Sequence, residues 1–599
     1  MRTLTLLAAG LSALSSGATA KSPVPTITYI VRVDSTHRDL IDVTMRLSGA
    51  PDRLRLAMRV HQEYDAQFWR YLQFGAVSAT SNDRAAAIAR RDTTLWDVSL
   101  PGGSGEVHYT LRLPTDPPRR AAWRTTVREN GALLNPPDVF LYLPDFPNAP
   151  STVQLVAPAS WRIATSLDSV GVRTRLHAPD AATLLDAPIL LGALRRWSFD
   201  DGGTHFTVAY WPLSTATPFD TIAFVDAVRR LSHSALDLFG SMPSRRYDFL
   251  IEDGAGDALE HRASVAIGMP STDLARDPRA LMFELAHELI HTWNLVAIHP
   301  DTYGDLAYRK PPPTRGLWWG EGVTLYYADV LLRRSGVYDS THSRVDRIGS
   351  LLSRYAAAPW ARSVSPEAAS LAFGRDLITN PNATGGYYLQ GELLAHAIDA
   401  AIRDSTGDRR GLDDVLRALY ARSRSGRGIT DAMWRAIADS VCGCRLNQLF
   451  ATQVSGTGPI DLGPAMARVG HHIVIDTIPS VDNDGNAVPD TRLNVVTSDS
   501  AVTLAITYES GIWSKAGLRT GDRVKSLNGV RVASVSDFTG QLRRLRIGDT
   551  VGVDVERAGQ LRHFDVTIEG FNRPRARLVD VPAPSAAQLA RRARWLAGW

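Results

Sequence analysis

Glu284-Leu-Ala-His-Glu-Leu-Ile-His-Thr-Trp-Asn294 is the most informative stretch of this sequence. Its apolar residues recur at helical spacing, which predicts a largely buried helix. On such a helix His287 and His291 lie one turn apart on the same face, the arrangement of two zinc ligands. Glu288 lies beside them, where its carboxylate can take a proton from water. The alternative is a helix that carries these three side chains on a solvated face with local charge pairing.

A catalytic zinc site needs a third protein ligand, and Glu321 is the best candidate. It lies in Leu317-Trp-Trp-Gly-Glu-Gly-Val-Thr-Leu-Tyr-Tyr327, where a Gly-Glu-Gly turn opens an apolar run typical of a second helix. The proline-rich segment 296–315 can turn the chain back so that the two helices pack together. A glutamate that only complements the helix dipole is the alternative. Together the two segments predict a metallopeptidase with Zn²⁺ as its cofactor.

These residues resemble the gluzincin peptidases, and among them the glycyl aminopeptidase family, peptidase family M61. Three blocks carry the resemblance: His287-Glu-Leu-Ile-His-Thr-Trp-Asn294, Gly320-Glu-Gly-Val-Thr-Leu-Tyr-Tyr327 and Ala258-Leu-Glu-His-Arg-Ala-Ser264. The resemblance implies a zinc ligand set that consists of His287, His291 and Glu321.

The same resemblance implies that Glu288 is the general base and that Glu260 accepts the free amino terminus of the substrate. A carboxylate near the metal can distinguish an ammonium group from an internal amide by a charge-assisted hydrogen bond. The alternative for Glu260 is a structural residue that pairs with Arg262. Asn294 and Tyr327 are candidates for residues that do not bind the metal but orient its ligands by hydrogen bonds.

A further block, Gly385-Gly-Tyr-Tyr-Leu-Gln-Gly391, precedes an apolar helix and resembles the Tyr-x-Lys-Gly block of these enzymes. Tyr388 matches the family's tyrosine, whose hydroxyl would donate a hydrogen bond to the oxyanion of the tetrahedral intermediate. Gln390 stands where lysine is usual, but that lysine is not a zinc ligand. A buried aromatic residue with its hydroxyl satisfied is the alternative for Tyr388.

Length and composition predict a multidomain globular protein. A chain of 599 residues is too long for one core and predicts three or four units. Hydrophobic residues at 44% and charged residues at 21% are typical of globular proteins. The net charge of +4 does not indicate nucleic-acid binding, because the basic residues are almost all arginines scattered between acids.

The chain begins with the pattern of a secretory signal at residues 1–20. Arg2 precedes an apolar run at residues 4–14, and Ala18-Thr-Ala20 is a small-residue cleavage site. The apolar run is too short to span a bilayer stably, so no membrane span is expected after cleavage. We therefore expect the mature protein in the periplasm or outside the cell.

The pattern along the chain predicts a multidomain α+β architecture. Residues 21–214 contain short runs of alternating apolar and polar residues, such as Phe206-Thr-Val-Ala-Tyr210, which predict an N-terminal antiparallel β-sandwich. Residues 215–465 change to long helical segments, and we interpret them as a thermolysin-like, largely helical catalytic domain.

Residues 466–572 return to strand patterns and predict a PDZ domain, followed by a tail at 573–599. Ala516-Gly-Leu-Arg-Thr-Gly-Asp522, followed by an Asn-Gly turn, carries the PDZ resemblance. PDZ domains bind extended peptides by adding a strand to a sheet edge. The alternative is a domain that only packs against the enzyme. The tail is interpreted as a short amphipathic helix docked on the body.

Two smaller features allow more than one interpretation. Cys442 and Cys444 do not make a disulfide framework, and we interpret them as free or locally bridged, without a catalytic role. Asp482-Asn-Asp-Gly-Asn486, followed by Asp490, has the oxygen-rich spacing of a calcium loop, although such clusters are more often plain turns.

The function that the sequence favours is a zinc-dependent aminopeptidase that removes N-terminal residues from peptides. The family resemblance implies a preference for Gly or Ala. One alternative is a zinc endopeptidase on the same site, with Glu260 structural and the PDZ domain holding a polypeptide. The other is a non-catalytic protein whose PDZ domain binds peptide partners.

Overall fold

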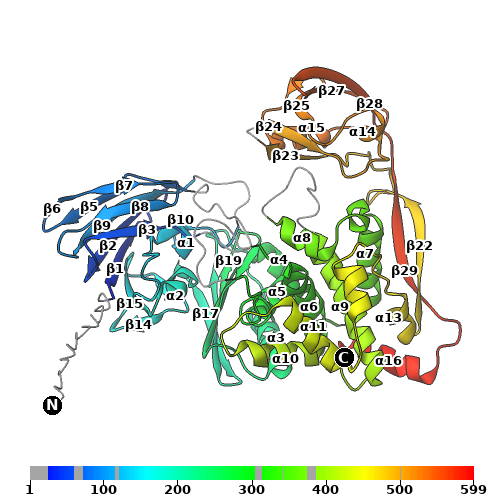
Figure 1. Ribbon diagram of the computed structural model, residues 1–599, viewed down its shortest axis with the longest axis horizontal. Helices are drawn as coiled ribbons and strands as arrows, with labels where there is room; N and C mark the ends of the chain where they lie inside the picture. Colours follow the sequence, from blue (N-terminus) through cyan, green and yellow to red (C-terminus); the bar gives the residue numbers. More distant parts are fainter. Residues whose placement is uncertain are drawn as a thin grey trace, which may run out of the picture.

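The computed structural model describes residues 24–59, 72–114, 121–303, 313–339, 342–373, 386–498 and 501–599. Figure 1 shows a β-rich N-terminal part, a largely helical middle part and a small C-terminal β domain held away from the middle part by a two-stranded ribbon. The predicted signal at residues 1–20 and residues 304–312 of the proline-rich loop lie outside the described residues. Among the described residues, no helix combines the length and apolarity that crossing a membrane requires.

The N-terminal part is built on a large sheet with the order β14-β15-β12-β1-β2-β9-β5-β6. In its central strands every second residue is buried, as expected for a sheet with one face packed on a core. The β-sandwich prediction gave an antiparallel sheet, but β1 and β12 pair in parallel. The bounds of these strands are β1 Thr26–Val33, β2 Leu40–Ser48, β5 Ser78–Ser81, β6 Arg84–Ala86, β9 Gly105–Arg112, β12 Ser151–Val156, β14 Asp168–Val170 and β15 Val172–Ala178.

Two smaller sheets complete the N-terminal part and share its core with the large sheet. One has the order β3-β8-β7 and the other β10-β11-β16-β13. Their strands are β3 Arg53–Ala57, β7 Ile88–Arg90, β8 Leu95–Ser99, β10 Thr126–Arg128, β11 Gly131–Leu134, β13 Arg162–Ala164 and β16 Ile189–Gly192.

The catalytic part begins with a five-stranded sheet of order β17-β18-β19-β21-β20. It includes Phe206-Thr-Val-Ala-Tyr210, which we had assigned to the N-terminal sandwich. The assignment was wrong because alternation predicts a strand but not the sheet that the strand joins, and here β18 pairs in parallel with β19. The bounds are β17 Arg195–Asp201, β18 Thr204–Trp211, β19 Arg246–Glu252, β20 Ala258–Glu260 and β21 Ser264–Gly268.

Helices pack on this sheet and on one another around one extended apolar core. The central three are α5, α6 and α9, and α6 contacts both of the others. The helices of this part are α3 Thr221–Phe239, α4 Ser271–Arg276, α5 Met282–His291, α6 Thr324–Arg334, α7 Arg344–Ala356, α8 Pro366–Ala372, α9 Gly386–Thr406, α10 Leu412–Ser423, α11 Asp431–Cys442 and α13 Gly463–Arg468.

A two-stranded ribbon connects the catalytic part to the PDZ domain. Its strands, β22 (His471–Pro479) and β29 (Asn572–Asp580), pair antiparallel along their full length. The ribbon lies against α7, where the Ala576 backbone N–H donates to the Ser353 hydroxyl over 2.7 Å. On the domain itself, the Tyr508 hydroxyl donates to the Ala357 carbonyl at the end of α7. These contacts give the PDZ domain a defined position relative to the helices.

The PDZ domain has its own core and a sheet of order β23-β24-β25-β27-β28, with β26 beside β25. The helix beside this sheet is α15, and β23 is an edge strand of the sheet. The bounds are β23 Asn494–Ser498, β24 Ala501–Ala505, α14 Ile512–Lys515, β25 Arg523–Leu527, β26 Val530–Arg531, α15 Val535–Leu542, β27 Thr550–Arg557 and β28 Gln560–Thr567.

The C-terminal tail forms α16 (Ala586–Leu596) and returns to the catalytic part, as Figure 1 shows. Arg344 donates to the Trp595 carbonyl and its guanidinium stacks on the Trp595 ring. Arg334 on α6 donates to the Gly598 carbonyl. The prediction of a docked amphipathic helix is confirmed, and its contacts tie the last residues to the helices of the core.

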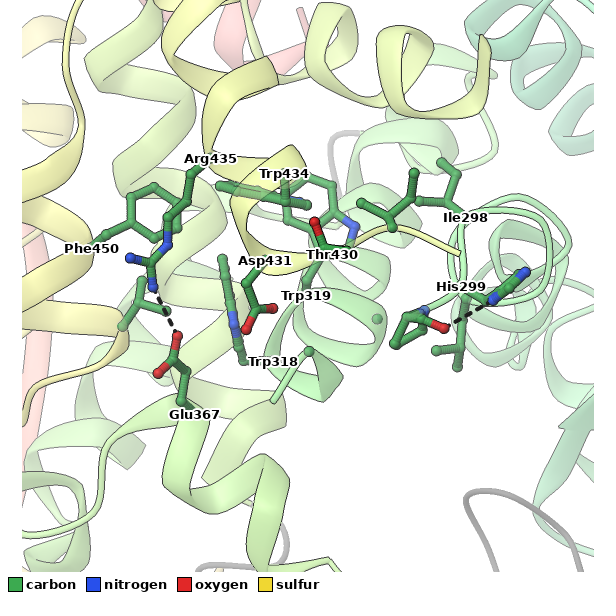
Figure 2. Close-up of a pocket in the computed structure, with 16 residues that line it drawn as sticks. Ile298, His299, Trp318, Trp319, Glu367, Thr430, Asp431, Trp434, Arg435 and Phe450 are labelled. Carbon is green, nitrogen blue, oxygen red and sulfur yellow. Dashed lines mark hydrogen bonds and ion pairs between the residues drawn. The ribbon is translucent and has the colours of Figure 1, made fainter. Parts of the chain in front are cut away.

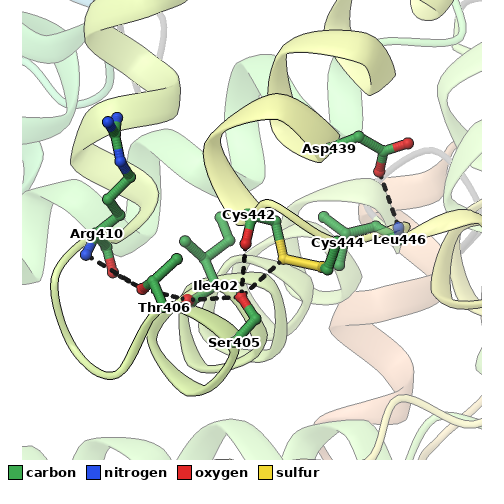
Figure 3. Close-up of a disulfide and its surroundings, with 8 residues drawn as sticks. All are labelled: Ile402, Ser405, Thr406, Arg410, Asp439, Cys442, Cys444 and Leu446. Atoms are coloured by element: carbon green, nitrogen blue, oxygen red, sulfur yellow. Dashed lines mark hydrogen bonds between the residues drawn. A yellow bond between two sulfur atoms is a disulfide. The ribbon is translucent and has the colours of Figure 1, made fainter.

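The structure shows the state of the two cysteines and of the acidic loop at 482–490. Cys442 and Cys444 form a disulfide at the end of α11, with the Ser405 hydroxyl 3.0 Å from the Cys442 sulfur (Figure 3). The interpretation of a local bridge is therefore correct, and the interpretation of free cysteines is wrong. In the acidic loop, the Asp482 carboxylate accepts backbone N–H groups, and Asp490 forms an ion pair with Arg492. These carboxylates stabilise a turn.

A buried histidine on α9 gives a testable pH dependence of stability. Burial, followed by the positive charge of Arg344, lowers the pKa of His396 to about 3. Between that value and the unfolded value of about 6.5, the unfolded chain binds a proton that the folded chain does not, so stability falls as pH drops. By pH 5, the wild type is expected to lose up to about 2 kcal/mol of its free energy of unfolding through this proton. We expect His396→Gln not to show this loss.

Denaturant unfolding of wild type and His396→Gln between pH 5 and 7.5 measures this effect. His472→Gln is the matched control, because His472 is exposed. Parallel pH profiles for wild type and His396→Gln would contradict the assignment.

Candidate metal centre

Helix α5 places its two histidines by ordinary helical geometry. Leu285, Ala286, Leu289 and Ile290 are fully buried and fix the helix against the core. His287 and His291 share the neighbouring face, because side chains four residues apart lie one above the other. Both imidazoles are buried, so the interpretation of a solvated helix face is wrong.

The carboxylate of Glu321 meets the two imidazoles. Glu321 lies in a wide helical turn, Trp318–Val323, that continues directly into α6. Its Oε2 atom is 3.2 Å from His287 Nε2 and 3.3 Å from His291 Nε2, and the two nitrogens are 2.9 Å apart. The three ligand atoms therefore surround a common point, as predicted for residues from two helices.

These three groups fit a divalent metal ion. Tetrahedral zinc with bonds of about 2.0–2.2 Å holds its ligand atoms about 3.3–3.6 Å apart, close to the distances seen here. Glu321 Oε2 is buried and has no hydrogen-bond partner despite its two nitrogen neighbours. A buried carboxylate oxygen without a donor is unfavourable unless a cation satisfies it.

The charge states of His287 and Glu321 suit metal binding, whereas His291 must release a proton: burial opposes its protonation, but the negative charge of Glu321 outweighs burial and raises the pKa of His291 well above its usual value. Burial lowers the pKa of His287, which keeps this imidazole neutral with a lone pair available. Burial opposes ionisation of Glu321, but the positive charge of His291 and the short contacts with both imidazoles outweigh it and hold the pKa of the carboxyl at about 2. Neutral imidazole and ionised carboxylate are the forms that bind zinc.

Asn294 joins the two ligand-bearing segments. Its backbone carbonyl accepts from Nδ1 of His291 at 3.0 Å, which fixes the tautomer with Nε2 free to bind. Its side-chain amide donates to the carbonyl of Gly320 and to the hydroxyl of Thr324. The prediction that Asn294 orients the ligands is supported by these contacts. Tyr327 does not share this role in the structure, because its hydroxyl donates to Asp413 instead.

Two glycines bring α9 against the helix that carries Glu321. A Cβ atom on Gly322 would collide with the backbone of Gly391, and one on Gly391 would collide with the carbonyl of Trp318. The close crossing places Tyr388, one turn before Gly391, with its ring centroid 6.3 Å from that of His287. We interpreted Gly322 as part of a turn, but it lies inside a helix and its role is this backbone contact.

Glu288 and Glu260 lie together beside the metal ligands. Carboxylate oxygens of both residues and a nitrogen of His291 lie within 4.8 Å of one another. Both carboxylates are buried. Burial and the negative charge of Glu260 raise the pKa of Glu288 well above its usual value. The structure therefore brings all six predicted site residues, from four separate segments, to one place.

Sequence reasoning missed one member of this environment. Tyr247 on β19 is buried, and burial raises the pKa of its hydroxyl, as do the charges of Glu288 and Glu260. Gln390, which replaces the family's lysine, lies behind the site and donates to the Val364 carbonyl.

Comparison with known proteins bears on the class of protein. Residues 28–193 match the Peptidase M61 N-terminal domain, residues 281–394 match M61 glycyl aminopeptidase and residues 495–568 match a PDZ domain. No curated protein sequence matches this chain.

Solved structures similar to this chain include an aminopeptidase N family protein and an M1 zinc metallopeptidase. An aminopeptidase N family protein from Idiomarina loihiensis is 20% identical, with a TM-score of 0.75 over 95% of this chain and 100% of that chain. An M1 zinc metallopeptidase from Deinococcus radiodurans is 17% identical, with a TM-score of 0.46 over 73% of this chain and 95% of that chain. The first likeness shows a shared fold over nearly the whole length.

The fold, the converging histidines and glutamate and the family match define this protein as a metallopeptidase. It carries the two domains of peptidase family M61, N-terminal and catalytic, followed by a PDZ domain. The predicted fold class and the predicted family are both confirmed.

Proposed function

We propose that this protein is a zinc-dependent aminopeptidase that hydrolyses the first peptide bond of peptides. The observation that carries the proposal is the convergence of His287 Nε2, His291 Nε2 and Glu321 Oε2, with Glu260 and Glu288 beside them. The three converging atoms would hold the zinc ion. When bound there, zinc would polarise the scissile carbonyl and lower the pKa of a water molecule.

The chain's own residues supply the remaining functions. Glu288 takes a proton from the attacking water and passes it to the leaving amine. Tyr388 donates a hydrogen bond to the developing oxyanion. Glu260 binds the substrate ammonium group, which sets the position of the first residue. Small first residues, Gly or Ala, are the proposed preference on the basis of the family.

Metal analysis and a peptide panel test the proposal. Purified protein is expected to contain about one zinc per chain, and a chelator is expected to abolish activity that added zinc restores. The panel compares peptides with a free amino terminus against the same peptides N-acetylated. Absence of both bound metal and hydrolysis would overturn the proposal and favour a non-catalytic binding protein.

Replacing the proposed ammonium acceptor separates its role from a structural one. Glu260→Gln removes a buried charge-assisted hydrogen bond worth about 1.5–3 kcal/mol. We therefore expect kcat/KM for free-amino peptides to fall about 10- to 150-fold, while any slow cleavage of acetylated peptides is unchanged. Asp257→Asn, an exposed carboxylate just before the same strand, is the matched control. An equal loss on both classes of peptide would indicate a structural role.

One observation keeps endopeptidase activity as the second candidate. The PDZ sheet has β23 as an edge strand beside α15, and PDZ domains bind an extended peptide at such an edge. A bound polypeptide would then be held near the catalytic part. Efficient cleavage of N-acetylated polypeptides, lost when the PDZ domain is competed with a peptide ligand, would favour this second function.

The proposal includes export to the periplasm or the cell exterior. The signal-like pattern at residues 1–20 supports it, although these residues lie outside the described part of the chain. The Cys442–Cys444 disulfide agrees with an oxidising compartment. Cell fractionation with N-terminal sequencing of the mature chain tests it.

A further inference from the structure

One arginine on α7 contacts both of the helices that face each other at the metal site. The Cζ atom of Arg347 lies 4.3 Å from the centre of the Phe283 ring in the first turn of α5, and its guanidinium donates to the Glu392 carboxylate on α9. Phe283 lies one turn before His287, and Glu392 lies one turn after Tyr388. Side chains four residues apart share a face of a helix. The same guanidinium therefore connects the two faces that carry these rings, whose centroids are 6.3 Å apart.

The turn that carries Glu321 is held by aromatic side chains. Trp319 and Trp318 lie against Trp434 of α11, with ring centroids 4.4 and 5.4 Å apart. Figure 2 shows the three indole rings close together. Edge-to-face contacts of this kind have a preferred geometry, so they fix the turn against α11.

The crossing between this turn and α9 has no side chains of its own. Gly322 and Gly391 meet there, and a Cβ atom on Gly322 would come within 2.7 Å of the Glu392 backbone nitrogen. The apolar side chains of α9 pack on the core, but apolar contacts have no preferred direction. A charge-assisted hydrogen bond has one. The Arg347–Glu392 pair lies directly beside the glycine contact, where it can set the rotation and height of α9 relative to α5.

Stability alone does not explain why two charges are placed here. The Glu392 side chain is 2% exposed, and burial raises its pKa, against which the positive charge of Arg347 acts. Removing two charges from water offsets most of their attraction, so apolar residues of similar volume are often equally stabilising at such a place. The neighbouring Asp329 has Arg333 at 2.9 Å and Arg344 at 3.0 Å, so it does not depend on Arg347 for a cation.

We propose that Arg347 and Glu392 are positioning residues, which hold Tyr388 at the distance from His287 where its hydroxyl reaches the reacting carbonyl oxygen. The pair acts through α9 and does not touch the substrate. The inference rests on the proposed function, because it concerns the step in which Tyr388 donates to the oxyanion. A displacement of about 1 Å at such a group can lower a rate about 100-fold.

Replacing both members of the pair separates positioning from stability. The double replacement Arg347→Met with Glu392→Met leaves neither charge without its partner, so we expect its unfolding free energy to stay close to that of wild type. Zinc content is expected to match wild type, KM to stay within about 2-fold, and kcat to fall about 10- to 100-fold. Glu392→Gln, which removes only the charge, is expected to lower kcat less and tests the pair if the double variant does not fold.

A double-mutant cycle shows whether the effect passes through Tyr388. Tyr388→Phe removes the oxyanion donor and is expected by itself to lower kcat about 100-fold or more. Adding the double replacement to Tyr388→Phe is expected to lower kcat little further, because groups that act as a unit are not additive. Arg403→Met is the matched control, since Arg403 is a partly buried arginine of α9 whose ion pair with Asp399 lies within that helix. It is expected to keep kcat.

A second readout needs neither activity nor metal. Zinc-free protein is labelled with 3-fluorotyrosine, and the ¹⁹F signal of Tyr388 is the one that Tyr388→Phe lacks. This signal is expected to shift or broaden in the double variant and to stay unchanged in Arg403→Met.

Three results would each overturn the inference: an unchanged kcat in the double variant, an equal fold-loss of kcat with and without the Tyr388 hydroxyl, and an unmoved ¹⁹F signal. These results leave the proposed function intact, provided that wild type binds zinc and Tyr388→Phe is impaired. A full kcat in Tyr388→Phe would instead remove Tyr388 from the proposed mechanism, and this inference with it.

Discussion

Glu288→Gln is expected to lower kcat about 10²- to 10⁴-fold while leaving the bound zinc in place, because a general base contributes about that much. Glutamine has the same shape but cannot accept a proton. Glu288 is not one of the three proposed zinc ligands, so its replacement leaves all three of them in place. Single-turnover hydrolysis of a free-amino peptide and metal analysis of the same sample measure the two effects.

Glu284→Gln is the matched control for this variant. Glu284 is on the same helix, one turn earlier, but its side chain is exposed. The control is expected to keep both activity and zinc. Retained turnover in Glu288→Gln would mean that another group removes the proton, and loss of zinc would mean that Glu288 is needed for metal binding.

Glu321→Gln is expected to lower the affinity for zinc by at least about 100-fold. Loss of residues that only support metal ligands reduces affinity about 10- to 100-fold, and a direct ligand contributes more. The amide also removes the negative charge that offsets the cation. Competition with a chromophoric chelator measures the affinity.

The same Glu284→Gln protein controls for the loss of a carboxylate on a neighbouring helix. Thermal unfolding with and without added zinc gives a second readout, because a bound ion stabilises the folded state by an amount that rises with the logarithm of its affinity. Wild type is expected to gain stability on zinc addition and Glu321→Gln to gain little. Equal zinc affinity in both proteins would place the metal elsewhere.

The two proposed metal ligands on α5 could be predicted from local sequence because helix geometry alone sets the relation of residues four apart. His287 and His291 follow from that rule, and Glu288 follows from its position between them. Glu321 needed a further assumption, that a loop returns the chain. The structure shows how this happens, because Asn294 bonds to both segments.

Sheet membership could not be predicted in the same way. The alternation at 206–210 predicts a strand correctly, but the partners of β18 are β17, which precedes it directly, and β19, which follows it after α3. Pairing depends on which strands are brought together, and a period of two residues carries no information about that.

By itself, the sequence determined the helix with two histidines and a glutamate, the strand and helix segments of the PDZ domain, and the family to which the blocks belong. These depend on short-range spacing. Only the tertiary structure decided that Glu260, Glu288 and Tyr388 lie beside the two histidines or Glu321, and that Gly322 and Gly391 allow the close approach of α9. Such contacts join residues distant along the chain, and packing of the whole core sets them.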